Sequence, residues 1–178
     1  MAKKFTALLL AQLLLLPGCK GKAVPATVSA DDALEAMLAV APEGTEGPEI
    51  ADGKTLDRCL ALYGVSAGQV VQCAAARMGG ARVFELAVLQ AVDSSAAADI
   101  ADALTTYAQQ RWAAFGGYAP DQAAIAENAL VTRHGDTWVL LILSEDPDAV
   151  YNAFLSFLKQ EPSPAPAGSD TPAPSPAP

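Results

Sequence analysis

Apolar residues along this chain recur with a helical period in four stretches and with a strand-like pattern in four others. In the helical stretches they are spaced three and four residues apart, with Asp or Ser before the stretch or Gly or Pro after it. The segment 42–53 holds two prolines and three glycines and is expected to be a loop. The predicted helices cover 33–40, 54–63, 149–159 and a long segment from the capping residues 93–95 to about 114, with a turn or two of helix at 122–127.

The four other runs are rich in Val, Leu and aromatic residues and predict β-strands. The runs 69–78 and 82–92 flank Gly79-Gly80, which can adopt positive φ and close a hairpin. The runs 129–133 and 137–144 flank a turn at His134-Gly135-Asp136 in the same way. The sequence therefore predicts two antiparallel hairpins.

The segment Trp138–Leu143 is apolar at every position, so both of its faces must be covered and it is expected to be a central strand. A second helix, a partner or neighbouring side chains would serve as the second cover. The elements follow one another in the order α-α-β-β-α-β-β-α. We expect an α+β fold in which the two hairpins form one sheet, with the long central helix and the N- and C-terminal helices packed on it.

The N-terminus has the pattern of an export leader. Lys3 and Lys4 precede an apolar run of twelve residues, 5–16, whereas a helix that spans a bilayer needs about 20. The sequence Leu16-Pro17-Gly18-Cys19 resembles a lipobox, although Pro17 departs from the small residue usual at that place. This resemblance implies removal of a signal peptide, residues 1–18, and diacylation of Cys19, which would anchor the protein to the cell membrane on its extracytoplasmic side.

The ends of the remaining chain differ in composition from its middle. Residues 19–30 are small and polar after the lipidated Cys and are expected to form a flexible tether. Residues 161–178 contain seven prolines and are expected to be a disordered tail, which acts as a solvated end, as a spacer through the cell wall or as a ligand for an aromatic groove. A single domain is therefore expected over 31–160.

The chain is acidic, with a formal net charge of -9, and the leader carries no acidic residue to offset its two lysines. Binding to nucleic acid or to anionic lipid headgroups needs clustered Lys and Arg, so both kinds of partner are excluded. Membrane attachment would then come from the lipid on Cys19. Two acyl chains supply the two hydrophobic signals that stable anchoring takes.

Two further cysteines, Cys59 and Cys73, are open to two interpretations. An exported chain meets an oxidising compartment, where a disulfide between them could contribute about 3 kcal/mol. Alternatively both are small buried apolar residues.

Glu85 interrupts a strand that is otherwise apolar on both faces. A carboxylate there must be paired, exposed to solvent or changed in protonation. We expect an ion pair with Arg77 or Arg82, at either side of the hairpin turn, rather than a ligand site.

Other chemistry has little support in the sequence. The chain has one histidine, His134, in a predicted turn, and it lacks Cys-x-x-Cys, His-x-x-x-His and Gly-x-Ser-x-Gly motifs. No metal site, cofactor or catalytic residue is therefore predicted.

The order of the elements resembles that of the DUF4358 family, uncharacterised bacterial lipoproteins of clostridial type. The resemblance spans about 30–159 and implies lipoprotein topology and an α+β domain, with no reaction, cofactor or ligand to transfer. The residues that carry it are 56–63, Glu85, Tyr118, Pro120, Asn128, Gly135 and 141–146.

These observations favour a membrane-anchored extracytoplasmic lipoprotein that serves as a non-catalytic binding or accessory module of the cell envelope. Its partner would be an envelope protein or a wall polymer. The alternative is a carboxylate-based envelope hydrolase, which needs two carboxyl groups about 5 to 9.5 Å apart in a cleft.

Overall fold

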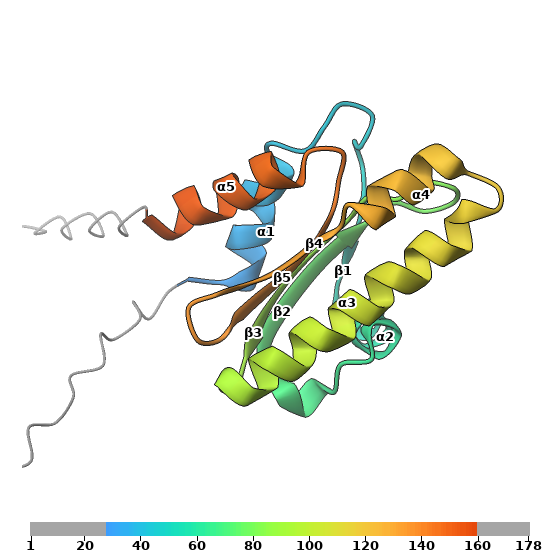
Figure 1. The fold of residues 1–178 in the computed structure, drawn as a ribbon. Coiled ribbons are helices and arrows are strands. Elements are labelled where there is room, and N and C mark those ends of the chain that lie inside the picture. Colours follow the sequence, from blue (N-terminus) through green and yellow to red (C-terminus); the bar gives the residue numbers. More distant parts are fainter. Residues whose placement is uncertain (1–27, 160–178) are drawn as a thin grey trace, which may run out of the picture.

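A computed structural model describes residues 28–159, so the predictions for the leader, for Cys19 and for the tail 161–178 lie outside the described residues. The described part forms five α-helices, one short 3-10 helix and five strands (Figure 1). The helices are α1 (Ala30–Leu38), α2 (Gly53–Tyr63), η1 (Ala67–Gln69), α3 (Ser94–Gly116), α4 (Pro120–Glu127) and α5 (Pro147–Lys159). The strands are β1 (Glu49–Ala51), β2 (Val70–Arg77), β3 (Glu85–Ala91), β4 (Leu130–His134) and β5 (Trp138–Leu143).

The strands form a single antiparallel sheet in the order β1-β2-β3-β5-β4. The two predicted hairpins, β2-β3 and β4-β5, join where β3 pairs with β5, with Glu85 opposite Leu143 and Gln90 opposite Trp138. The helices α3 and α4 connect the two hairpins, and they place β4 at one edge of the sheet. The predicted α+β class and the order of the main elements are confirmed.

Helices cover both faces of the sheet (Figure 1). Leu141 and Val139 of β5 point into a core with α2, α3 and α4, whereas Leu140 and Ile142 point into a second core with α1 and α5. Every residue of β5 is buried. The expectation that Trp138–Leu143 is a central strand is therefore confirmed, and its second cover is the pair of terminal helices.

Several helix caps lie where the sequence predicts them, although α1 begins at Ala30 and ends at Leu38 instead of covering the predicted 33–40. Ser29 caps α1 by accepting a hydrogen bond from the backbone N–H of Asp32 at 3.0 Å, and Asp93 caps α3 through the N–H of Ala96 at 2.8 Å. Gly64 ends α2 with φ of 73°, a conformation that costs glycine little. The longest helix begins at Ser94 and ends at Gly116, two residues beyond the predicted end.

Two further differences from the prediction concern the segment 42–53 and the start of the fold. The expected loop 42–53 contains β1, which pairs with β2 and places Ile50 opposite Ala76. Three residues are too few to show the alternation of apolar and polar residues that predicts a strand. This segment forms a strand because it pairs with the otherwise unpaired edge of β2. The ordered fold also begins before residue 31, because the side chain of Gln72 donates to the carbonyl oxygen of Val28 at 3.0 Å and accepts from the N–H of Ala30 at 2.9 Å.

Within residues 28–159 no helix is both long enough and apolar enough to cross a membrane.

Candidate functional site

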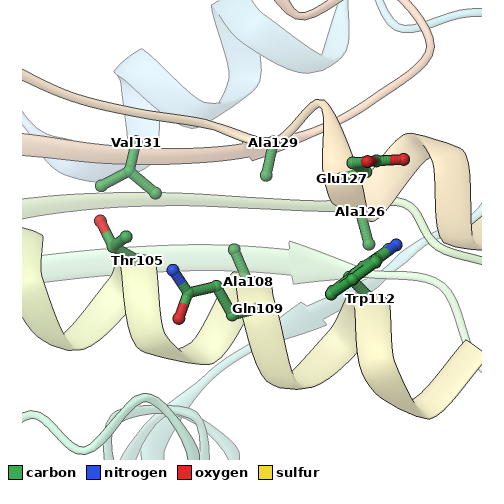
Figure 2. Close-up of a pocket in the computed structure, with 8 residues that line it drawn as sticks. All are labelled: Thr105, Ala108, Gln109, Trp112, Ala126, Glu127, Ala129 and Val131. Carbon is green, nitrogen blue, oxygen red and sulfur yellow. The ribbon is translucent and has the colours of Figure 1, made fainter.

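A pocket of about 360 Å³ opens between α3, α4 and the start of β4, and we call it the α3–α4 groove. Figure 2 shows Thr105 and Ala108 of α3 pointing toward Val131 and Ala129 across the groove, and Trp112 beside Ala126 of α4. Its volume is near the lower end of the range for ligand pockets in proteins. The lining residues are Thr105, Ala108, Gln109, Trp112, Ala126, Glu127, Ala129 and Val131.

The groove results from the size of the side chains on neighbouring elements. Thr105, Ala108, Gln109 and Trp112 are spaced at three and four residues and so form one stripe along α3. This stripe lies beside the stripe that packs on the sheet, which includes Ile100 and Leu104. Alanines on α3, on α4 and before β4 are too small to fill the space between the elements, so a hollow remains.

Trp112 is the dominant side chain of the groove, with 47% of its surface exposed. Glu127, the last residue of α4, lies with Trp112 at the same end of the groove (Figure 2). The groove thus combines a small apolar floor, an aromatic ring with an indole N–H donor, and a carboxylate. Sequence reasoning missed both residues. The available signal was a large aromatic residue on the longest helix that lies outside its buried stripe.

Glu85, the residue that the sequence singled out, lies in the core and not in a cleft. Its side chain is 1% exposed, and its two carboxylate oxygens each accept a hydrogen bond from a tyrosine. The hydroxyl of Tyr63 on α2 donates to Oε1 at 2.8 Å, and the hydroxyl of Tyr107 on α3 donates to Oε2 at 2.8 Å. The rings of the two tyrosines also meet edge to face, with centroids 5.0 Å apart.

The arginines around Glu85 differ from the expected pair. Arg77 is its cross-strand neighbour on β2, as expected from the hairpin. Arg82, the other arginine that the sequence offered, instead donates to the carbonyl oxygen of Gly44. The nearest cation is Arg111 on α3, whose Nε lies 4.0 Å from Oε2 and whose guanidinium also lies 4.7 Å from the centre of the Phe115 ring.

The surroundings of Glu85 keep the two tyrosines in their protonated form. Burial, and then the negative charge of Glu85, raise the pKa of Tyr63 well above its ordinary value, and the same two causes raise the pKa of Tyr107. Both phenols therefore act as hydrogen-bond donors. The Glu85 cluster, which we define as Glu85, Tyr63, Tyr107 and Arg111, ties α2 and α3 to the start of β3.

A hydrolase needs carboxylates that reach a bound substrate. With 1% of its surface exposed, Glu85 has no such access. The geometry of the Glu85 cluster is therefore that of a structural network and gives no support to a role for Glu85 in hydrolysis.

Cys59 on α2 is buried in the core that α3 also lines, Cys73 on β2 is half-buried against the same core, and both are free thiols in the structure. Burial raises the pKa of Cys73 to about 12, and burial followed by the charge of Glu85 raises the pKa of Cys59. Thiols in such surroundings are poor nucleophiles and poor metal ligands. Cys59 thus packs as a small buried apolar side chain, whereas Cys73 is only partly buried.

His134 is the last residue of β4 and packs edge to face on Phe154 of α5, with ring centroids 5.8 Å apart. It is half-buried and not an exposed turn residue, because α5 lies over this end of the hairpin. Among residues 28–159 no three His, Cys, Asp or Glu side chains gather in a way that could hold a metal ion.

Comparison with known proteins places this fold in a family. The model of the DUF4358 family, described as a domain of unknown function, matches residues 47–144. That range runs from just before β1 to just after β5, so it includes the Glu85 cluster and the α3–α4 groove and leaves out α1 and α5. Neither the curated proteins nor the solved structures contain a match to the chain. Because the family model matches more than half of the sequence, the chain belongs to the DUF4358 family.

Proposed function

We propose that this protein is a lipid-anchored, non-catalytic binding module of the cell envelope, which holds a protein or a wall polymer in the α3–α4 groove. The observation that carries this proposal is Trp112, an aromatic side chain 47% exposed over a floor of small apolar residues. Trp is enriched among the residues that dominate binding energy at protein interfaces. A half-exposed Trp in a pocket is therefore a good anchor for a partner.

The lipid anchor is inferred from the leader and from Cys19. Diacylation would hold the domain at the outer side of the cell membrane, and residues 20–27 would separate Val28, the first residue that the structure describes, from the lipid. The Cys19→Ala variant is expected to move from the membrane fraction to the soluble fraction on cell fractionation. Unchanged membrane retention would instead indicate an uncleaved N-terminal helix.

Photocrosslinking in native membranes tests the groove. A benzoylphenylalanine replaces Gln109, which is exposed in the groove, and in a matched control it replaces Val71, which is 65% exposed on β2. We expect a crosslinked product from position 109 and none from position 71. The product should decrease when Trp112→Ala is added. Absence of any product at position 109, or equal products at the two positions, would refute binding at the groove.

The same product distinguishes the two kinds of partner. A protein partner gives a discrete product that a protease digests, whereas a wall polymer gives a product that a muramidase shortens.

A further inference from the structure

The outer edge of β4 lies next to the α3–α4 groove, and the two features together specify the kind of partner. β4 is the last strand of the sheet and pairs with β5 alone among the described strands. Its five residues, Leu130–His134, therefore present one row of backbone N–H and C=O groups on the side away from β5. An extended polypeptide can pair with such a row.

The groove lies where alternate side chains of an added strand would project. Val131 of β4 and Ala129 just before it line the groove, so the face of the sheet toward α3 opens into it. A strand added to β4 would lie about 4.8 Å further out, with every second side chain on that same face. At least one of these side chains would enter the space between α3 and α4.

The charge of the groove indicates which side chain fits. Glu127 is the only charged residue among the eight that line it, and the chain as a whole carries a net charge of -9. A Lys or Arg side chain can lay its aliphatic part over the alanine floor, set its cation on the face of Trp112, and pair with Glu127. An acidic side chain at this place would meet the carboxylate of Glu127 and be repelled.

We infer that the α3–α4 groove binds an extended segment of a partner protein, which adds a strand to the outer edge of β4 and places a Lys or Arg side chain against Trp112 and Glu127. This inference rests on the proposed function and commits the partner to a basic polypeptide rather than a wall polymer.

A phage-displayed library of random nine-residue peptides, panned on the full chain solubilised in detergent, provides the test. We expect the enriched peptides to share a Lys or Arg flanked by residues that favour strands. The chain has two tryptophans, and Trp138 is only 6% exposed. A change in tryptophan emission when a synthetic peptide binds will therefore report contact with Trp112.

Variants then test the contacts by fluorescence anisotropy of the labelled peptide. Trp112→Ala should weaken binding by about thirtyfold or more, and Glu127→Gln by about fivefold, because aromatic anchors dominate interfaces and a carboxylate at the rim contributes less. Asp99→Asn, which removes an exposed carboxylate on α3 outside the groove, is the matched control and should change the affinity less than twofold. Unchanged thermal unfolding of each variant ensures that a loss of binding is not a loss of fold.

Hydrogen exchange identifies the mode of binding. We expect backbone amides of β4 that face away from β5 to exchange more slowly in the complex, whereas an occupant that only fills the groove would leave them unchanged. The inference would be overturned if no peptide is enriched or if the enriched peptides lack Lys and Arg. It would also be overturned if Glu127→Gln and the unmodified chain bind the peptide equally well, or if the β4 amides are not protected in the complex. A muramidase-sensitive product from position 109 would also overturn it while leaving the proposed function intact, and absence of any product would overturn both.

Discussion

Replacing the two tyrosines of the Glu85 cluster by phenylalanine should destabilise the domain unequally. Each replacement removes one hydroxyl, and with it a 2.8 Å hydrogen bond to a carboxylate oxygen of a residue that is 1% exposed. Tyr63→Phe leaves Oε1 without its donor. Tyr107→Phe leaves Oε2 with the guanidinium of Arg111, whose Nε lies 4.0 Å away, is buried and makes no hydrogen bond.

The magnitudes follow from this difference. A buried acceptor left without a partner costs about 1–3 kcal/mol, and hydrogen bonds to charged groups lie in the upper part of that range. We therefore expect Tyr63→Phe to lower the free energy of unfolding by about 2–3 kcal/mol. Tyr107→Phe should cost about 1–2 kcal/mol, because a shift of about 1 Å brings Arg111 within hydrogen-bond distance of Oε2. At about 3 °C per kcal/mol for a domain of this size, the lower Tm distinguishes the two variants as well.

Urea unfolding of the Cys19→Ala chain, followed by circular dichroism, measures both changes at constant m-value. Tyr118→Phe is the matched control, because the Tyr118 side chain is 65% exposed, and its effect should stay within about 0.5 kcal/mol. A larger loss for Tyr107→Phe than for Tyr63→Phe, or losses below 0.5 kcal/mol for both, would refute the reasoning about the Glu85 cluster.

Three further outcomes follow from the structure. A thiol reagent should titrate two thiols in the denatured Cys19→Ala chain without reductant, and no reactive thiol there would establish the disulfide instead. In the folded chain at pH 8 both thiols should react at least about tenfold more slowly, because burial raises the pKa of Cys73 to about 12 and also raises the pKa of Cys59. The pKa values of the Tyr63 and Tyr107 phenols are higher in the folded than in the unfolded chain, so their contribution to stability is complete below about pH 10 and declines as the pH rises above it. Ultraviolet titration should therefore show that these two phenols ionise together with unfolding. Gradual ionisation in the folded state would contradict this. Gly64→Ala should lower the free energy of unfolding by about 1 kcal/mol, because alanine is strained at the φ of 73° that Gly64 adopts, while the added Cβ meets no atom within 4 Å. A neutral effect in urea unfolding would count against a left-handed cap.

The candidate site was predictable only in part. Glu85 stood out in the sequence because a carboxylate in an apolar strand needs a partner, and the hairpin correctly placed Arg77 across from it. Its hydrogen-bond partners come from α2 and α3, both 22 residues away along the chain, and no local spacing links them to β3. Trp112 and Glu127 were passed over for a related reason, since the groove exists only where α3, α4 and β4 meet.

The sequence by itself determined the local elements and the class of the fold. The short-range signals were the helical stripes, the all-apolar segment Trp138–Leu143 and the glycines at the turns. Each depends only on the side chains within one element and on which of them must be buried. Such signals established the two hairpins, the long helix and the helix ends, and they are also the source of the expectation for Cys19.

Only the tertiary structure decided how these elements meet. The pairing of β3 with β5 and the pairing of the short strand β1 with β2 are contacts between segments far apart in the sequence. The resulting strand order leaves β4 at the edge of the sheet. The same packing closed Glu85 in the core and opened the α3–α4 groove beneath Trp112. Burial and exposure depend on what each element packs against, and the pattern within a single element does not carry that information.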